Sequence, residues 1–229
     1  MNRSKKPADY LALLEEIHGY LRPRTYVEIG VARGRSFSRV GPGTLAVGID
    51  PVLSRQLPLN RSAKLFAMES DDFFEEHDLR QVLEGLPVDL AFIDGMHLSE
   101  YVLRDFMNLE RFCDEGSALL VHDCYPRDAK AASRERDPVF WTGDVWKLIV
   151  CLRQYRPDLQ IAVVDVPPTG LGIVTGLDPA SSVLRDRYRE LLERFVNMDY
   201  SVLEGEAPER LGVIANDWSL VREALPLPR

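Results

Sequence analysis

The chain has 229 residues, of which 45% are hydrophobic and 28% are charged, and this composition is typical of one compact α/β domain that buries its own core. Its formal net charge of −8 argues against a nucleic-acid-binding protein, because neutralising phosphates requires a basic face. We therefore expect small-molecule or protein partners and no nucleic acid.

The sequence gives no sign of secretion or of membrane insertion. The chain starts with the basic residues Arg3, Lys5 and Lys6 but lacks an apolar stretch of signal-peptide length after them, and no uninterrupted apolar run approaches the ~20 residues of a membrane span. The three cysteines, Cys113, Cys124 and Cys151, are odd in number and show no CxxC spacing, which argues against a disulfide framework and a zinc site. We expect a cytoplasmic protein with buried free thiols and no membrane partner.

Short apolar segments alternate with helical patterns along the first half of the chain. Apolar residues at helical spacing predict a first helix that ends near Pro23. Five apolar runs follow, and short runs of this kind suit strands that helices cover on both faces. They predict strands at residues 24–30, 44–50, 63–68, 88–95 and 117–123. Between them we expect a helix at residues 70–83 and another from Ser99 to about Gly116.

The next part of the chain predicts a helix at residues 144–155 and then a pair of strands. The runs "QIAVVDV" and "GIVTGL" are joined by a short Pro/Gly turn that leaves no room for a crossover helix, so the pair must be antiparallel. A dinucleotide dehydrogenase sheet stays parallel at this point, whereas a terminal antiparallel hairpin is typical of a methyltransferase sheet. The predicted fold is therefore α/β and Rossmann-like: a doubly wound, mostly parallel seven-stranded sheet with a terminal antiparallel hairpin.

We expect a single methyltransferase domain over residues 1–229. It consists of an N-terminal helix at 1–23, a core at 24–176 and a C-terminal helical extension at 177–229, which contains a helix at 181–197. The two outer segments offer faces to a second subunit, so a monomer and a homodimer both stay open.

The turn after the first expected strand is not a dinucleotide fingerprint. In "GVARG", Ala32 stands where GxGxxG has its middle glycine, and the acidic Glu28 comes just before the turn. A carboxylate there would repel a pyrophosphate, but it suits a ligand with an ammonium or a sulfonium charge. S-adenosylmethionine carries both.

The acid, the spacer and the glycine turn resemble the first motif of the class I S-adenosylmethionine-dependent methyltransferases. This resemblance implies that the turn passes under the amino-acid end of the cofactor, that Asp50 accepts hydrogen bonds from the ribose hydroxyls, and that the adenine lies near the end of the third strand. The predicted cofactor-binding residues are Glu28, Gly30, Gly34, Asp50, Met68, Glu69, Ser70, Asp71 and Asp94.

A closer resemblance covers about residues 24–176. Its motifs resemble the small-molecule O-methyltransferase branch that includes macrolide-sugar methyltransferases and cephalosporin hydroxylase-like proteins. They are "FIDGMHLSEYVLRDF" at 92–106, "LLVHDCYP" at 119–126 and "GDVWK" at 143–147.

In metal-dependent members of that branch, acids at the ends of strands four and five hold Mg²⁺. The resemblance implies that Asp94 and Asp123 are metal ligands and that His97 is the base that deprotonates the acceptor hydroxyl. His122 stands where those members have Glu, so it joins Asp94 and Asp123 in the predicted metal site. Mg²⁺, a Mn²⁺-like preference and no metal all stay open. Both aspartates could instead cap loops, and His97 could cap the following helix.

The predicted function is S-adenosylmethionine-dependent O-methylation of a hydroxyl on a small-molecule acceptor, such as a sugar or a secondary metabolite. One alternative is a non-catalytic relative that binds the cofactor, which His122 favours. Another is a nicotinamide-dependent oxidoreductase, which the missing fingerprint and the hairpin disfavour. Residues 125–143 are polar and long for a connection, and this predicts a lid over the acceptor site. Glu100 and Asp105 are expected on a solvated helix face or in a salt bridge.

Overall fold

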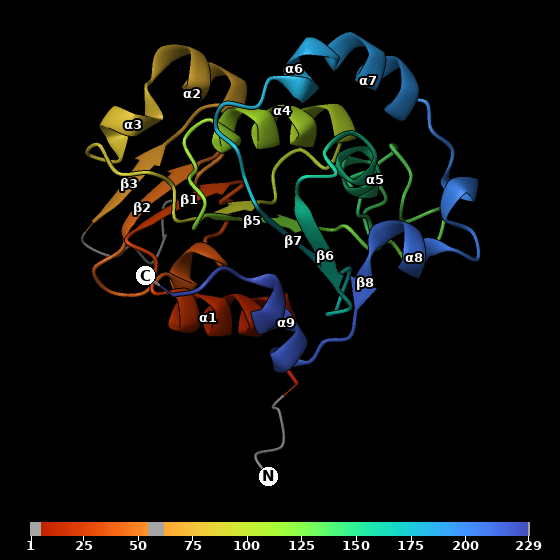
Figure 1. Ribbon diagram of the computed structural model, residues 1–229, viewed down its shortest axis with the longest axis horizontal. Coiled ribbons are helices and arrows are strands. Elements are labelled where there is room, and N and C mark those ends of the chain that lie inside the picture. The colour runs from red at the N-terminus through yellow and green to blue at the C-terminus, as the bar shows by residue number, and fades with distance from the viewer. Residues whose placement is uncertain (1–5, 55–61, 229) are drawn as a thin grey trace.

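An eight-stranded sheet lies at the centre of the computed structural model, which describes residues 6–54 and 62–228 (Figure 1). The strand order is β3-β2-β1-β4-β5-β7-β6-β8. Neighbouring strands are parallel except at β7, which is antiparallel to both β5 and β6. The strands are β1 Thr25–Ile29, β2 Leu45–Ile49, β3 Ala63–Phe66, β4 Leu90–Ile93, β5 Ala118–His122, β6 Gln160–Val164, β7 Leu171–Thr175 and β8 Val213–Ile214. The predicted mostly parallel sheet with its antiparallel hairpin is confirmed.

The prediction of seven strands is wrong, because β8 adds an eighth strand beside β6. The pairing is short: the Val163 amide donates to the Gly212 carbonyl at 3.0 Å, and the Asp165 amide donates to the Ile214 carbonyl at 2.9 Å. A strand of two half-buried residues leaves no apolar run in the sequence.

Helices cover both faces of the sheet, as Figure 1 shows. One face carries α1 (Tyr10–Leu21) and α9 (Trp218–Ala224), which pack into one hydrophobic cluster with the strands. The second cluster lies on the other face. Its helices are α2 Ser70–Glu76, α3 Leu79–Val82, α4 Ser99–Glu110, α5 Trp146–Tyr155, α6 Val183–Asp186, α7 Tyr188–Phe195 and α8 Ala207–Leu211. Two short 3₁₀ turns are η1 Phe37–Arg39 and η2 Tyr200–Leu203.

Two of the expected helices are broken in the structure. The single helix predicted at 70–83 ends at Glu76, because His77 is extended and the Asp78 carboxylate caps a new start by accepting from the Arg80 amide at 2.9 Å. The helix predicted at 181–197 is likewise divided into α6 and α7. Helical spacing of apolar residues continues across the second break, from Leu184 to Tyr188 and Leu191, so the pattern alone does not reveal that break.

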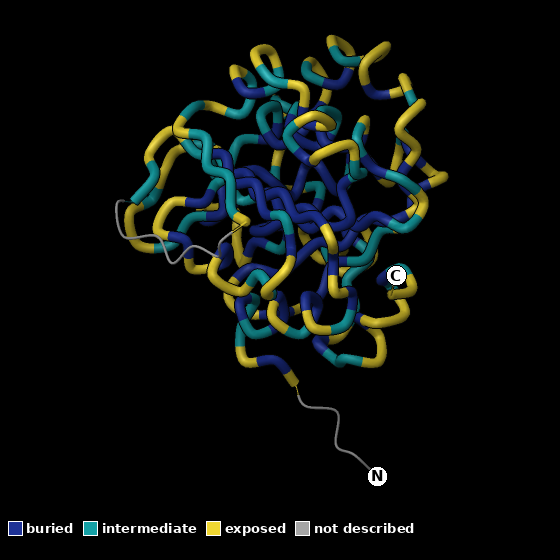
Figure 2. The backbone as a smooth tube through the Cα atoms, turned by 90° about the vertical axis from the view of Figure 1, so that its left-hand side faces the viewer, coloured by how far each residue is buried: buried dark blue, intermediate teal, exposed yellow. Residues whose placement is uncertain are grey.

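The central strands are the most buried part of the chain, as the dark centre of the tube in Figure 2 shows. Every residue of β1, β4, β5 and β7 is buried. The three cysteines are free and buried, as the sequence predicts. Among the described residues, no helix combines the length and the apolar character that crossing a bilayer requires.

Candidate active site

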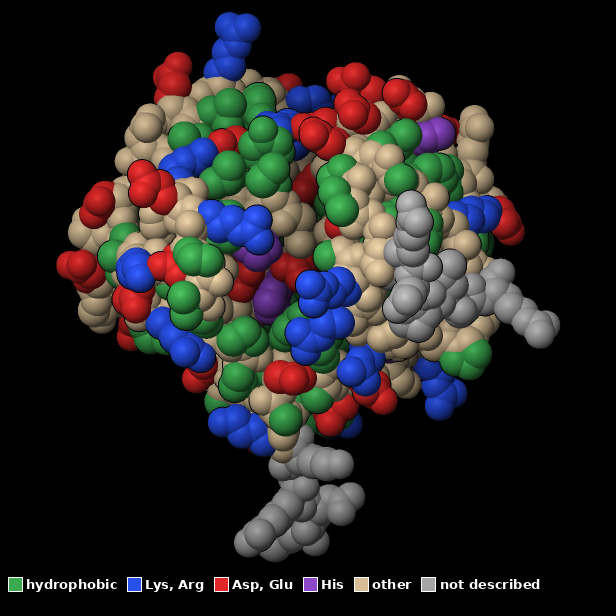
Figure 3. All heavy atoms as spheres, turned by 180° about the vertical axis from the view of Figure 1, so that it is seen from behind, with side chains coloured by type: hydrophobic (Ala, Val, Ile, Leu, Met, Phe, Trp, Pro, Cys, Tyr) green, Lys and Arg blue, Asp and Glu red, His purple; other side chains and the backbone are tan. Residues whose placement is uncertain are grey.

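The carboxyl ends of the parallel strands open into a cavity of about 550 Å³. Figure 3 shows histidine and acidic side chains in a hollow that lysine and arginine side chains flank. The predicted cofactor residues that line the cavity are Gly30, Asp50, Glu69, Ser70, Asp71 and Asp94. His97, His122 and Asp123 line it as well. The structure therefore places most residues of the predicted cofactor site, and the predicted metal ligands and base, around the same cavity.

Gly30 allows β1 and β4 to end in close contact. It has a φ of +92°, and a Cβ at this position would overlap the backbone carbonyl of Asp94. The Gly30 amide donates to the Ile49 carbonyl at 2.9 Å, and the Asp94 amide donates to the Ile29 carbonyl at 2.8 Å. Glycine is needed here because a side chain would separate the two strand ends that line the cavity.

Glu28 lies behind the turn and is fully buried. Its carboxylate accepts hydrogen bonds from the Tyr26 hydroxyl and the Ser36 hydroxyl, both at 2.6 Å. Burial raises the pKa of Glu28 to about 8, although both hydrogen bonds act in the opposite direction. Its side chain supports the turn from within the core, and a direct role in cofactor binding stays a prediction.

We expect Glu28→Gln to gain stability relative to the wild type as the pH rises. Between pH 4.5 and 8 the unfolded chain ionises Glu28 while the folded chain keeps it protonated, so the wild type loses unfolding free energy over this range. Glutamine mimics the protonated acid and removes this loss. Chemical denaturation at pH 6 and pH 8 measures the effect, which is about 2 kcal/mol in favour of the variant between the two pH values.

Glu75→Gln provides the control for this pH dependence, since it removes a carboxylate that is exposed and not buried. A stability difference between Glu28→Gln and the wild type that stays constant from pH 6 to pH 8 would contradict the raised pKa.

Asp50 ties the end of β2 to the glycine turn. Its carboxylate accepts from the Ala32 amide at 2.8 Å and from the Val52 amide at 2.6 Å. Each oxygen keeps a second lone pair for a ligand hydroxyl. Gly34 and Met68 lie outside the cavity lining: Gly34 closes the turn with a φ of +72°, and Met68 packs against the core.

The opposite wall of the cavity comes from α2 and α4. The Ser70 hydroxyl donates to Asp105 at 2.6 Å, and Asp71 pairs with Arg104 at 2.8 Å. Asp105 is buried and lines the cavity, so its predicted place on a solvated face or in a salt bridge is wrong. Burial raises its pKa to about 7. Glu100 does form a salt bridge, with Arg134 at 2.6 Å.

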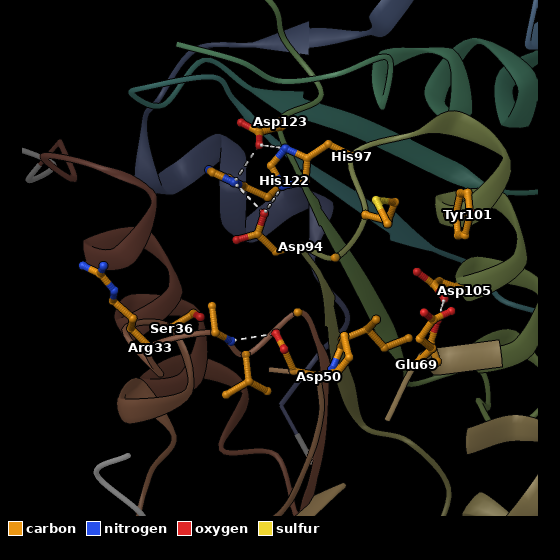
Figure 4. A pocket seen from close by; sticks show the side chains of 18 of the residues that line it. Arg33, Ser36, Asp50, Glu69, Asp94, His97, Tyr101, Asp105, His122 and Asp123 are labelled. Atoms are coloured by element: carbon orange, nitrogen blue, oxygen red, sulfur yellow. Dashed lines mark hydrogen bonds and ion pairs between the residues drawn. The ribbon is translucent and has the colours of Figure 1, made fainter. Parts of the chain in front are cut away.

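Two aspartates and two histidines meet where β4 and β5 end (Figure 4). The Nε2 atom of His97 lies 3.4 Å from Asp94 Oδ1, and its Nδ1 atom lies 3.0 Å from Asp123 Oδ2. The Nδ1 atom of His122 lies 3.0 Å from Asp94 Oδ1 and 3.5 Å from Asp123 Oδ2. Both imidazoles therefore face the same two carboxylates.

This arrangement favours two imidazolium–carboxylate pairs. Burial opposes the charge on His122, but Asp94 and Asp123 outweigh it and raise the pKa of His122 to about 10. Burial likewise opposes the charge on His97, and the same two aspartates raise its pKa. Burial disfavours the ionised form of Asp94, yet the two histidines hold its pKa at about 2. Protons and a divalent cation would thus compete for the same carboxylate oxygens.

The donor atoms of this cluster fit a small divalent cation. Asp94, His97 and Asp123 each offer one ligand atom, and these atoms lie within 4.8 Å of one another. His97 Nδ1 and His122 Nε2 are buried without a hydrogen bond of good geometry. Carboxylates suit Mg²⁺ and Mn²⁺, and an imidazole shifts the set towards the transition metals. From the sequence, His122 is a predicted metal ligand and His97 the base. In the structure, both histidines face the carboxylate oxygens of Asp94 and Asp123.

The segment predicted as a lid is bonded to the rest of the site. Arg134 pairs with the buried Asp144 at 2.7 Å, and the Asp144 carboxylate also accepts from the Ser99 amide at the start of α4 at 2.7 Å. The Trp141 indole donates to the Ser133 carbonyl at 2.7 Å, and its ring stacks on His97 with centroids 5.1 Å apart. These contacts make the segment a wall beside His97, and its movement as a lid stays a prediction.

Tyr10 is a site residue that sequence reasoning missed. It is the first residue of α1, it lines the cavity, and its ring lies 4.0 Å from the ring of His122 between centroids. Helical spacing places it beside the apolar residues of α1, and no sequence signal links it to a histidine in β5. Only the packing of α1 under the sheet brings the two rings together.

One segment of the chain matches a known protein family. Residues 27–124, from β1 to just past the end of β5, match the family model described as a methyltransferase domain. No curated protein matches the chain.

Several solved structures share the fold. The O-methyltransferase TomG from Streptomyces achromogenes, involved in tomaymycin synthesis and in complex with SAM, is 15% identical and has a TM-score of 0.53, with 71% of this chain and 77% of that chain covered. An O-methyltransferase from Bacillus cereus in complex with SAH is 14% identical with a TM-score of 0.53, covering 76% and 82%. An SAH-bound methyltransferase from Podospora anserina is 13% identical with a TM-score of 0.54, covering 72% and 77%.

The predicted resemblance to the class I S-adenosylmethionine-dependent methyltransferases is confirmed by the family model and by the fold. At identities of 13–15% the solved structures establish the fold alone, so the acceptor chemistry has to come from the site itself.

Proposed function

We propose that this S-adenosylmethionine-dependent methyltransferase acts on a hydroxyl of a small molecule, with His97 as general base and a divalent cation held by Asp94 and Asp123. The observation that carries the proposal is the single cavity, which has the glycine turn and Asp50 at one side and the aspartate–histidine cluster at the other. Two solved O-methyltransferases share the fold, which agrees with an oxygen acceptor.

The cofactor supplies an electrophilic methyl group, and the protein has to position the acceptor and remove its proton. Asp50 offers acceptor oxygens for ribose hydroxyls, while Glu69 and Asp71 line the far wall. Arg33 and Arg35 also line the cavity beside the glycine turn, where they suit the carboxylate at the amino-acid end of the cofactor.

The two histidines differ in their access to an acceptor. The side chain of His97 is 21% exposed and stacks on Trp141, whereas His122 is 8% exposed and lies under Tyr10. A general base has to reach the hydroxyl, so His97 is the better base and His122 the better cation ligand or orienting group. His97 also has to be unprotonated to act as a base, and a cation on Asp94 and Asp123 would favour this by taking the place of the imidazolium protons. A cation at Asp94 and Asp123 would bind the acceptor oxygen and lower its pKa.

Acceptors that differ only in the reacting group test this proposal. Small hydroxylated compounds, their O-methyl ethers and the corresponding amines and thiols would be incubated with S-adenosylmethionine, and formation of S-adenosylhomocysteine would be measured with EDTA, Mg²⁺ or Mn²⁺ present. We expect turnover of hydroxyl compounds only, and a lower rate after chelation that either cation restores. Turnover of an amine or a thiol but of no hydroxyl compound would overturn the assignment of an oxygen acceptor. Full activity in EDTA would overturn the proposed role of the divalent cation.

A further inference from the structure

A second cavity of about 550 Å³ lies beside His97. It shares Gly95, Met96 and His97 with the cofactor cavity, so the two spaces meet at the general base. Its other walls come from the segment that contains Arg134 and Trp141. The glycine turn lines the cofactor cavity but not this second one, so a molecule here could reach the base without occupying the place of the cofactor.

The walls of this cavity combine apolar and charged side chains. The Trp141 ring lies parallel to the His97 ring within 13°, and Phe140 stands beside it in the lining. Val139 and Met96 also line the cavity and are 90% and 53% exposed, which is high for large apolar side chains. Such surface favours an acceptor with an apolar or aromatic body.

The charges around the cavity are not balanced. The charge of Asp137 is neutralised by Lys130 at 2.7 Å, and its carboxylate also accepts from the Val139 amide at 2.8 Å. Arg134 is paired with Glu100 and Asp144. Among the described residues that line this cavity, Arg136 is the remaining permanent charge. It is exposed, and no carboxylate of the described part of the chain lies within ion-pairing distance of it.

Arg136 lies close to the reacting end of the site. Its guanidinium carbon is 5.9 Å from the centroid of the Trp141 ring, and that ring is itself stacked on His97. One small molecule can therefore span the distance from the base to the guanidinium. An arginine binds planar oxyanions through two parallel hydrogen bonds, and a carboxylate is such a group.

We propose that the acceptor is an apolar hydroxy compound with a carboxylate, which Arg136 binds while the hydroxyl reaches His97. This inference rests on the proposed O-methylation, because it assigns the second cavity to that acceptor. The chain has a net charge of −8, so its overall field disfavours an anionic ligand and a local cation has to offset it.

Binding of two probes to the protein saturated with S-adenosylhomocysteine tests the inference. The probes are 6-hydroxy-2-naphthoate, whose hydroxyl and carboxylate lie at opposite ends of the two rings, and its neutral counterpart 2-naphthol, and calorimetry measures both affinities. We expect the wild type to bind the anionic probe about threefold to tenfold more tightly than the neutral one, and this preference to shrink in high salt. In Arg136→Gln the preference should disappear while 2-naphthol binds as before.

Arg189→Gln is the matched control, since it removes the same charge from an exposed position on α7 that lies outside the linings of both cavities. This variant should keep the wild-type preference. If the wild type shows no preference or binds neither probe, or if Arg136→Gln keeps the preference, the inference is overturned. Binding of S-adenosylhomocysteine, measured first in every variant, separates these results from a failure of the methyltransferase assignment itself.

Discussion

Replacing His97 by glutamine is expected to lower kcat by about 10²–10⁴-fold while the affinity for S-adenosylhomocysteine stays within about twofold of the wild type. Glutamine keeps a polar side chain beside Asp94 and Asp123 but cannot take up a proton. Because His97 lies between the cofactor cavity and the second cavity, its loss should affect the chemical step and not the binding of the cofactor. Steady-state kinetics with an acceptor from the hydroxyl screen, together with calorimetry, measures the two quantities.

His122→Gln separates the roles of the two histidines. If His122 helps to hold the cation, raising the Mn²⁺ concentration should restore much of the activity of His122→Gln and little of that of His97→Gln. His77→Gln is the control, because His77 packs against Phe66 and Phe73 away from the site and should retain wild-type kinetics. Wild-type turnover in His97→Gln would remove His97 from the mechanism.

The strands β1, β4 and β5, which position the glycine turn and the aspartate–histidine cluster, could be predicted from the sequence because they are uniformly buried. A strand such as β5, buried at all five positions, leaves an unbroken apolar run that ends at a polar residue. Since parallel strands end at one edge of the sheet, the residues that follow β4 and β5 could also be expected to meet. The meeting of Asp94 with His122 and Asp123 follows from that rule.

The directions of the side chains could not be predicted in the same way. Glu28 is in the motif that suggests the cofactor, yet its carboxylate points into the core and binds Tyr26 and Ser36. Asp105 sits on a helix whose acids are usually solvated, but the packing of α2 beside α4 buries it against Ser70. Each outcome depends on a neighbouring element whose position the local sequence does not specify.

Replacing Gly30 by alanine is expected to have the largest structural effect at the site. The substitution introduces a left-handed strain at a φ of +92° and also places a Cβ against the Asp94 carbonyl, which belongs to the backbone and cannot rotate away. We expect a loss of at least about 3 kcal/mol of unfolding free energy and at least a tenfold weaker affinity for S-adenosylhomocysteine. Chemical denaturation and calorimetry measure these two effects.

Gly43→Ala separates the strain from the overlap, because Gly43 has nearly the same φ, +91°, but has no atom within 4 Å of an added Cβ. This control should lose about 1–2 kcal/mol from the strain alone and should bind S-adenosylhomocysteine normally. The difference between the two variants then measures how closely the ends of β1 and β4 have to approach. Equal losses in both, with normal cofactor affinity, would mean that the turn tolerates a side chain and that the contact with Asp94 does not shape the cavity.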